Sequence, residues 1–230
     1  RVGTDATFPP MEYVENGRRT GFDIELVEAL AKAMGKQVEW VDIDFKGLIP
    51  GLISKRFDMA VSAIYITDER KKVVDFTDLF TLAPVQYVAK AGSGITEDPA
   101  TLRGKTVGIY SGSSHETYLK KRLPKSQSGI AIKAYPSQDP IWLDLEAGRV
   151  QAALTDTTVA HEWLEKTGKA KGFALAGKPL NDVAMFGEGT GIAVRKGDPL
   201  REKLNTALQA IIEDGTYKQI NDKYFPFSIY

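Results

Sequence analysis

The sequence contains no cysteine among its 230 residues and only two histidines. Without cysteine the protein has no disulfides, no thiolate nucleophile and no structural zinc site built on cysteine ligands. The absence excludes no compartment, because a chain of this length buries about 70–75% of its unfolded surface and folds without covalent cross-links. The length suits one large domain or two modest ones.

Net charge is absent as well, since 30 lysine and arginine residues balance 30 aspartate and glutamate residues. The chain therefore lacks the excess of positive charge that binding to nucleic acid or to an anionic membrane surface requires. No stretch approaches the length of about 18 uninterrupted apolar residues that a membrane span needs. The start, Arg1-Val2-Gly3-Thr4, is β-rich and unlike a signal peptide, which leaves a cytoplasmic protein or one whose targeting segment has been removed.

What the sequence does contain is an alternation of short β-rich runs with amphipathic helical segments. Residues 22–34 place apolar side chains at helical spacing before Gly35, and residues 58–64 form a nearly continuous apolar run. Such alternation predicts an α/β fold with parallel sheets and helices on both faces, and the pattern resets near residues 82–85. Further helices are predicted over 48–54, 67–73, 115–123, 140–147, 157–166, 199–214 and 216–224, and further strands over 38–43, 85–90, 106–110, 130–134, 150–154 and 192–194.

The segment Thr67-Asp68-Glu69-Arg70 follows the buried strand and begins a short helix. Thr67 is predicted to cap this helix, and Arg70 in its first turn opposes the helix dipole. Helix N–H groups, a hydroxyl and a guanidinium together suit a carboxylate or phosphate. The alternative is that Arg70 only pairs with a neighbouring acid.

A similar strand-to-helix construction occurs at residues 107–116, where Gly112-Ser113-Ser114 precedes the helix. This turn offers N–H groups and hydroxyls to an anion, or else Ser113 or Ser114 simply caps the helix. Neither serine has the flanking glycines of a nucleophile elbow, so a serine hydrolase is not supported.

Two carboxylates stand where predicted strands end. Asp156 is either an N-cap or, if it faces a cleft, the partner of an ammonium group. Asp5 and Phe8 stand close together before Pro9 and Pro10, which forbid continuation of the strand. Three aromatic side chains at comparable strand exits are candidate walls of a small pocket: Phe45, Tyr65 and Tyr110.

Motifs for cofactors are missing. No phosphate-binding loop, no dinucleotide fingerprint and no metal spacing of histidines with acids is present. The sequence therefore predicts no cofactor and no metal site.

Several short motifs follow one another along nearly the whole chain in a recognisable order. They are Val2-Gly3-Thr4-Asp5, Gly21-Phe22-Asp23-Ile24, Ile66-Thr67-x-x-Arg70 with Asp75-Phe76, Gly104-Lys105-x-Val107-Gly108, Leu145-x-Ala147-Gly148-Arg149, Phe186-Gly187-x-Gly189-Thr190-Gly191, and Asp214-Gly215-Thr216-Tyr217 with Lys223-Tyr224-Phe225. Together they resemble the periplasmic amino-acid-binding proteins of ABC importers (solute-binding protein family 3), and most closely the lysine/arginine/ornithine- and histidine-binding members.

The resemblance implies the two-lobe type II periplasmic-binding-protein fold, each lobe a mostly parallel sheet flanked by helices. Lobe 1 would comprise residues 1–82 and 190–230, and lobe 2 residues 86–180. Two crossing hinge strands would lie at about 82–86 and 181–190, and the ligand would be held between the lobes.

The resemblance also implies the role of each site residue. The residue matching Arg70 clamps the ligand α-carboxylate, and the one matching Asp156 takes the α-ammonium. The predicted carboxylate ligands are Arg70, Tyr65, Ser114 and Thr67; the ammonium ligands are Asp156 and Ala63; the side-chain contacts are Asp5, Phe8, Phe45, Ser62, His115 and Tyr110. Asp5 would bind the cationic group of the ligand side chain, and Phe8 and Phe45 would lie on either side of the aliphatic stem of the ligand.

The implied function is a non-enzymatic receptor that binds one free L-α-amino acid, basic in character (arginine, lysine, ornithine or histidine), and delivers it to an ABC permease. It would act as a monomer in the periplasm, its signal peptide removed, without nucleic acid or cofactor. The alternatives are binding of a polar amino acid such as glutamine, a small hydro-lyase on the same fold with Asp5 or His115 as its acid, and a sensory ligand-binding domain.

The sequence departs from the resembled family at several positions. Tyr65 stands where close relatives carry a small hydroxyl residue, and His115 stands where a glutamine is usual. Serine replaces threonine at Ser114, and Ala31 and Val38 replace a disulfide pair. The first two departures bear on which amino acid fits.

Overall fold

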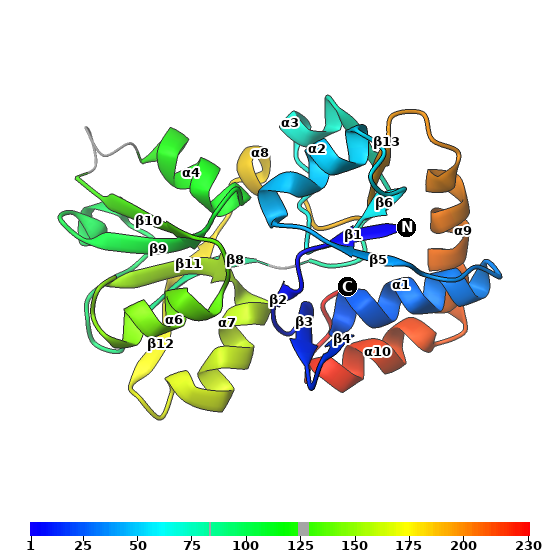
Figure 1. Ribbon diagram of the computed structural model, residues 1–230. Helices are drawn as coiled ribbons and strands as arrows, with labels where there is room; N and C mark the ends of the chain where they lie inside the picture. Colours follow the sequence, from blue (N-terminus) through cyan, green and yellow to red (C-terminus); the bar gives the residue numbers. More distant parts are fainter. Residues whose placement is uncertain (83, 124–128) are drawn as a thin grey trace. The chain divides into compact units, whose positions relative to one another are not determined.

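The computed structural model describes residues 1–82, 84–123 and 129–230 (Figure 1). Residue 83, within the predicted hinge at 82–86, lies outside the described residues. The chain divides into two compact units. Unit 1 comprises Arg1–Leu82 and Gly187–Tyr230, and unit 2 comprises Ala83–Phe186.

Unit 1 is built on a five-stranded sheet of order β5-β1-β6-β13-β7. Its strands are β1 (Val2–Thr4), β5 (Trp40–Asp42), β6 (Met59–Ala60), β7 (Val74–Phe76) and β13 (Ala193–Arg195). β1 runs parallel to both β5 and β6, whereas β13 runs antiparallel to β6 and β7. A strand from near the end of the chain therefore lies between two strands from its first third.

A hairpin sheet adds to unit 1 beside the main sheet. It consists of β2 (Thr7–Phe8), β3 (Glu12–Glu15) and β4 (Arg18–Thr20), all antiparallel. Asn16 and Gly17 connect β3 to β4 with φ angles of 51° and 76°. Two successive residues with positive φ form the turn that matches the twist of a two-residue hairpin, which explains the Asn-Gly pair.

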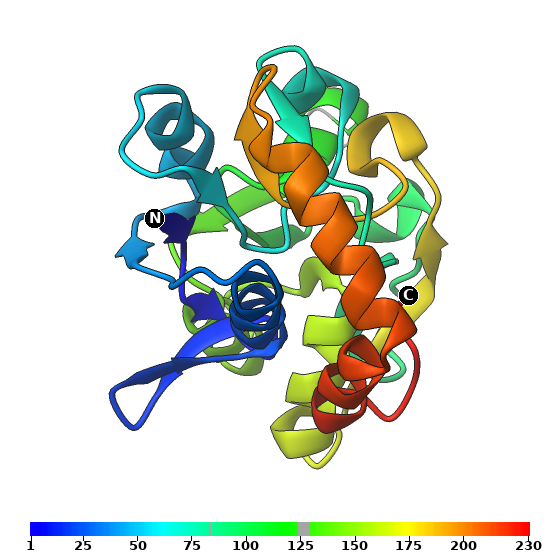
Figure 2. The same ribbon diagram turned by 90° about the vertical axis from the view of Figure 1, so that its right-hand side faces the viewer.

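Helices cover the sheet of unit 1. They are α1 (Phe22–Ala33), η1 (Phe45–Gly47), α2 (Leu48–Ile53), α3 (Asp68–Lys71), α9 (Leu200–Glu213) and α10 (Thr216–Tyr224). The C-terminal helices α9 and α10 pack against α1, as Figure 2 shows in orange, red and blue. The buried ring of Phe22 meets Tyr217 edge-on and Phe225 at a tilt, so aromatic packing joins the two ends of the chain.

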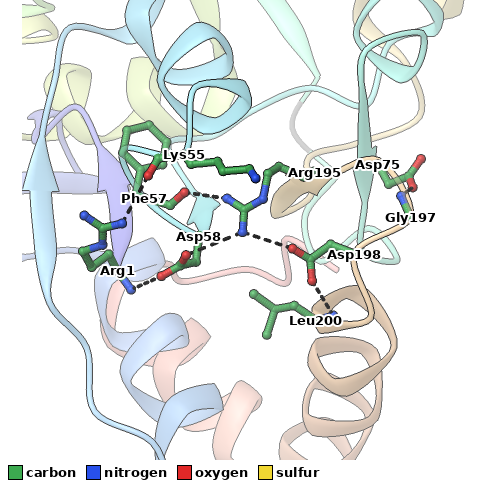
Figure 3. Close-up of polar contacts among 9 residues, drawn as sticks. All are labelled: Arg1, Lys55, Phe57, Asp58, Asp75, Arg195, Gly197, Asp198 and Leu200. Atoms are coloured by element: carbon green, nitrogen blue, oxygen red, sulfur yellow. Dashed lines mark hydrogen bonds and ion pairs between the residues drawn. The ribbon is translucent and has the colours of Figure 1, made fainter.

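An arginine ties three parts of unit 1 together (Figure 3). Nη1 of Arg195 donates to the carbonyl of Phe57 at 2.8 Å, and Nη2 lies 3.1 Å from Oδ2 of Asp198 and 3.5 Å from Oδ1 of Asp58. Oδ1 of Asp198 in turn accepts the N–H of Leu200, the first residue of α9. The end of β13, the start of β6 and the start of α9 thus share one guanidinium.

The segments that leave and re-enter unit 1 meet side by side. Thr81 and Thr190 form an antiparallel bridge, and their hydroxyl oxygens lie 2.5 Å apart in the buried interior. Thr190 also bridges Tyr65, which follows β6. These contacts anchor both connecting segments to the edge of the sheet where the candidate residues of unit 1 lie.

Unit 2 repeats the layout on a second five-stranded sheet of order β10-β9-β11-β8-β12. Its strands are β8 (Val85–Lys90), β9 (Thr106–Tyr110), β10 (Ala131–Tyr135), β11 (Ala152–Asp156) and β12 (Phe173–Leu180). Its helices are η2 (Pro99–Leu102), α4 (Ser114–Arg122), α6 (Asp139–Glu146), α7 (Thr157–Trp163), the π-helical turn η3 (Leu164–Gly168) and α8 (Val183–Phe186). Trp142 and Trp163 stack with ring centroids 4.4 Å apart and join α6 to α7.

The α/β prediction is confirmed, and most predicted elements lie within one or two residues of their observed bounds. Both sheets are mixed, each with two parallel and two antiparallel pairings, so they are less uniformly parallel than expected. The predicted strand over 58–64 is wrong beyond its start, because β6 ends at Ala60 and Ala63 adopts a left-handed φ of 45°. The helix predicted over 157–166 changes to a π-helical turn after Trp163.

No helix in the described ranges combines the length and apolar character that crossing a membrane requires.

Candidate functional site

Arg70 lies in α3, between β6 and β7 in the chain. Thr67 caps this helix as predicted, because its Oγ1 accepts the N–H of Arg70 at 3.3 Å. Nη1 of Arg70 donates to the carbonyl oxygen of Tyr65 at 2.9 Å, and the guanidinium carbon lies 5.5 Å from the ring centre of Phe45. In the part of the chain that the structure describes, Arg70 forms no ion pair with an acid, so the simple pairing alternative is not supported.

The Arg70 side chain is half-buried. Burial lowers the pKa of its guanidinium to about 10, so the group still carries its charge at neutral pH. A desolvated cation without an acidic partner gains most from an anion that arrives as a ligand. This part of unit 1 is therefore suited to a carboxylate.

Asp5 follows β1 and is almost fully buried. Its Oδ1 accepts the hydroxyl of Thr7 at 2.9 Å, and its Oδ2 accepts the backbone N–H of Phe45 at 2.7 Å. Its own N–H donates to Oγ of Ser62 at 3.2 Å. Because β1 and β6 run parallel, the residues that closely follow them, Asp5 and Ser62, meet at the same edge of the sheet.

Phe45 links the two charges of this region. Its ring faces the Arg70 guanidinium, and its backbone N–H holds the Asp5 carboxylate. Phe8 of β2 and Tyr65 are also buried in unit 1. Unit 1 therefore combines a cation, a carboxylate and aromatic rings, all among the predicted site residues.

Two buried carboxyl groups form hydrogen bonds with the Ser62–Ala63 segment. The sequence interpretation did not assign either of them to the site. Ser62 Oγ donates to Glu12 Oε1 at 2.7 Å, and the N–H of Ala63 donates to Asp23 Oδ2 at 2.8 Å. Asp23 belongs to one of the quoted motifs, but Glu12 had no signal beyond an acidic residue next to the apolar Met11.

The second group of predicted residues lies in unit 2, at the ends of β9 and β11. Ser113 is the serine that caps α4, since its Oγ accepts the N–H of Glu116 at 3.2 Å and donates to the carbonyl of Tyr110. Ser114 is the first residue of α4 and is buried. Tyr110, at the end of β9, is buried as well.

His115 and Asp156 form a hydrogen-bonded pair in this second group. Nε2 of His115 lies 3.0 Å from Oδ1 of Asp156, and the exposed fractions of the two residues are 3% and 1%. Asp156 is the N-cap residue of α7, but its side chain makes no capping hydrogen bond. The carboxylate is thus oriented by an imidazole from α4, and the imidazole in turn stacks at a tilt beside Phe186.

The predicted residues divide between the two units. Unit 1 contains Asp5, Phe8, Phe45, Ser62, Ala63, Tyr65, Thr67 and Arg70, and unit 2 contains Tyr110, Ser114, His115 and Asp156. Among the residues described, no three or more histidine or acidic side chains are arranged to hold a metal ion. The oriented cation of Arg70 and the oriented carboxylates of Asp5 and Asp156 suit the binding of charged groups of both signs.

Comparison with known proteins assigns the family. Residues 1–227 match the bacterial extracellular solute-binding proteins, family 3. The chain belongs to this family. Its members are binding proteins, which agrees with the charge-recognition chemistry described above.

Curated relatives share more than a third of their residues with the chain. The L-arginine-binding protein of Pseudomonas aeruginosa is 40% identical over 232 residues, which cover 100% of this chain and 89% of the relative. The lysine/arginine/ornithine-binding periplasmic protein of Escherichia coli K12 is 38% identical and covers 100% of this chain and 88% of the relative. Both relatives are binding proteins rather than enzymes.

Solved structures show the same fold. An ancestral arginine-binding protein bound to arginine has a TM-score of 0.88 at 39% identity, with 97% of this chain and 96% of that chain covered. A second structure of an ancestral arginine-binding protein, bound to glutamine, has a TM-score of 0.86 at 38% identity, with 98% and 97% covered. These neighbours confirm the type II periplasmic-binding-protein fold predicted from the sequence.

Proposed function

We propose that the protein binds one free L-α-amino acid with a cationic side chain, such as arginine, lysine, ornithine or histidine. The observation that carries this proposal is the pair of opposite charges held by Phe45, whose ring faces Arg70 and whose amide fixes Asp5. A basic amino acid carries a carboxylate at one end and a cation at the other. Each end then has an oppositely charged partner in unit 1.

The proposed roles follow from this polarity. Arg70, Thr67, the backbone at Tyr65, and Ser114 bind the α-carboxylate. Asp156 and the backbone of Ala63 bind the α-ammonium, and His115 orients Asp156 through the hydrogen bond seen at 3.0 Å. Asp5 and Ser62 bind the cationic group of the ligand side chain. Phe8, Phe45 and Tyr110 contact the aliphatic stem of that side chain. Each buried charge-assisted hydrogen bond contributes about 1.5–3 kcal/mol.

The proposal includes a conformational step. Units 1 and 2 act as the two lobes, with residues of about 82–86 and 181–190 as hinges, and the ligand engages side chains from both. Closing the lobes on the ligand orders both sets of side chains, a cost that the charge-assisted bonds offset. The closed protein, a monomer in the periplasm, delivers the amino acid to the permease of an ABC importer. The relatives named above support this role.

Glutamine is the second candidate ligand, because one similar solved structure holds it. Its side-chain amide is neutral, so it leaves the buried charge of Asp5 without a compensating cation, which is costly. A basic amino acid is therefore favoured.

A ligand panel tests the proposal. Thermal unfolding is followed with each of the twenty common amino acids and with ornithine, and isothermal titration calorimetry then gives Kd values for the ligands that raise Tm. We expect the largest Tm shifts with arginine, lysine, ornithine or histidine. A protein whose Tm responds to none of them contradicts the proposal, and a preference for glutamine supports the second candidate.

A further inference from the structure

Two fully buried carboxyl groups contact the Ser62–Ala63 segment of unit 1. Glu12 of β3 and Asp23 of α1 each have an exposed fraction of 0%. Glu12 accepts the hydroxyl of Ser62, and Asp23 accepts the N–H of Ala63. The charge of Asp23 also lies close enough to act on Glu12.

Two carboxylates close together in a buried environment repel each other, and protonation of one of them removes the repulsion. Burial, followed by the nearby charge of Asp23, raises the pKa of Glu12 well above its ordinary value. Glu12 therefore takes up a proton at a higher pH than an ordinary glutamate does.

The titratable groups around this pair come from three other elements. Asp5, which follows β1, acts on Glu12 with a like charge that also raises its pKa. Tyr217 of α10 lies near Asp23, and its pKa is raised first by burial and then by that carboxylate. None of these groups supplies a positive charge that would offset the repulsion between the two carboxyl groups.

We propose that the buried carboxyl groups of Glu12 and Asp23 are positioning residues that set the amino-acid site of unit 1 for a ligand side chain rich in N–H donors. This inference rests on the proposed function. Glu12 and Asp23 act through the two residues to which they are hydrogen-bonded, Ser62 and Ala63.

The first effect concerns the hydroxyl of Ser62. Its single hydrogen is committed to Glu12 at an O···O distance of 2.7 Å, and its oxygen accepts the N–H of Asp5 at 3.2 Å. A serine hydroxyl has one donor and two acceptor positions, so Ser62 can offer a ligand only an acceptor. An acceptor beside the Asp5 carboxylate selects a guanidinium or ammonium group.

The second effect concerns the backbone of Ala63. A left-handed φ of 45° is costly for a residue with a Cβ, and it persists only where the surroundings enforce it. The hydrogen bond from the Ala63 N–H to the buried Asp23 carboxylate, 2.8 Å long, holds this conformation. The turn at Ala63 in turn directs the chain out of β6 toward Tyr65 and Thr67.

Replacement of Glu12 provides a direct test, because Glu12→Gln reproduces the protonated state. A glutamine Oε1 can still accept from Ser62, and its Nε2 can donate to Asp23 without a titratable proton. Glu12→Ala removes both contacts. The matched control is Glu15→Gln, which removes an exposed carboxylate from the same strand.

Calorimetry with arginine and with glutamine as probes gives the first readout. Glu12→Gln is expected to keep the wild-type arginine Kd within about threefold, whereas Glu12→Ala should weaken arginine binding at least tenfold more than glutamine binding. In Glu12→Ala the released Ser62 hydroxyl can donate to a glutamine carbonyl but not to a guanidinium. Equal losses for the two ligands, or a Glu12→Gln variant as weak as Glu12→Ala, would overturn the proposal.

Thermal unfolding between about pH 5 and pH 8 gives a second readout that needs no ligand. A folded-state pKa above the unfolded value of about 4.3 means that the folded protein holds a proton that the unfolded chain has released. Wild-type stability should therefore fall with rising pH relative to Glu12→Gln, while Glu15→Gln follows the wild type. Parallel pH curves for wild type and Glu12→Gln would overturn the raised pKa of Glu12, even if Glu12→Ala does not fold.

The two proposals fail in different ways. A wild-type protein that binds no amino acid contradicts the proposed function and the positioning role with it. The pH curves would then still decide whether the pKa of Glu12 is raised in the folded protein.

Discussion

Nε2 of His115 lies 3.0 Å from Oδ1 of Asp156 in the buried interior of unit 2. The two residues are 41 positions apart in the sequence, one in the first turn of α4 and the other at the end of β11. An imidazole that hydrogen-bonds one oxygen of a carboxylate fixes the direction in which the carboxylate faces its ligand.

His115→Ala should weaken arginine binding about tenfold or more, because the variant loses a hydrogen bond to a charged group worth about 1.5–3 kcal/mol. His115→Gln should recover most of the affinity, since an amide N–H can replace the Nε2 donor. Isothermal titration calorimetry measures both. The other histidine, His161, provides the control: it lies in α7, 3.6 Å from Glu165, and His161→Gln should bind like the wild type. A normal Kd for His115→Ala would show that Asp156 needs no orienting partner.

Arg70→Met should weaken the binding of every amino acid by about a hundredfold or more, because a buried carboxylate would lose its cationic partner. Arg70→Lys keeps the charge but loses the planar fork and part of the contact with Phe45, so we expect an intermediate Kd. Arg18→Met, in the exposed part of β4, is the matched control. Retention of wild-type affinity by Arg70→Met would rule out its role at the carboxylate.

Asp5→Asn should reduce arginine and lysine affinity by at least tenfold while changing glutamine affinity much less. The asparagine side chain can still accept from Thr7 or from the Phe45 amide but brings no charge to a cationic ligand. Calorimetry with the three ligands measures the ratio, and Asp44→Asn, on the exposed residue before η1, controls for a change of charge nearby. Equal losses for all three amino acids would mean that Asp5 supports the fold and does not read the ligand side chain.

Asp144 should stabilise unit 2 at neutral pH but not in acid. Its carboxylate lies 2.5 Å from Nζ of Lys133, with Tyr135 and Arg149 as further partners, and these contacts hold its pKa far below the ordinary value. A depressed folded-state pKa gives stability that is present above the unfolded pKa of about 3.9 and is lost as the pH falls below it.

The test compares the Tm of Asp144→Asn with that of the wild type across this range. We expect a lower Tm for the variant at pH 7 and a difference that shrinks as the pH falls below about 4. Asp139→Asn, an exposed aspartate at the start of α6, should show little effect. A Tm difference that stays constant with pH would indicate lost packing rather than a lost charge.

Local signals in the sequence predicted much of the fold. The helix predicted over residues 216–224 has the observed bounds of α10, and the cap at Thr67 follows from a β-branched hydroxyl residue before two acids. Both depend on residues within a few positions of each other. Such local rules are the ones that a single sequence carries.

Other features depend on partners far away in the chain. The run over residues 58–64 is apolar enough for a strand, but the hydrogen bond from Ala63 to Asp23, 40 positions away, turns it out of the sheet. The burial of Glu12 likewise depends on packing that no periodicity describes. Family resemblance grouped Arg70, Asp5 and Asp156 by role, yet the pairing of His115 with Asp156 became visible only in the folded chain.

The position of β13 between β6 and β7 has a consequence for how the protein is made. During synthesis, residues 1–82 emerge first but cannot complete their sheet until residues 193–195 follow. The contiguous segment Ala83–Phe186 is available earlier and can fold first, as complete stretches of a nascent chain do. Until then β6 and β7 present unpaired edges, which are sites for association with other chains. The period of greatest aggregation risk is therefore the interval between translation of β7 and translation of β13.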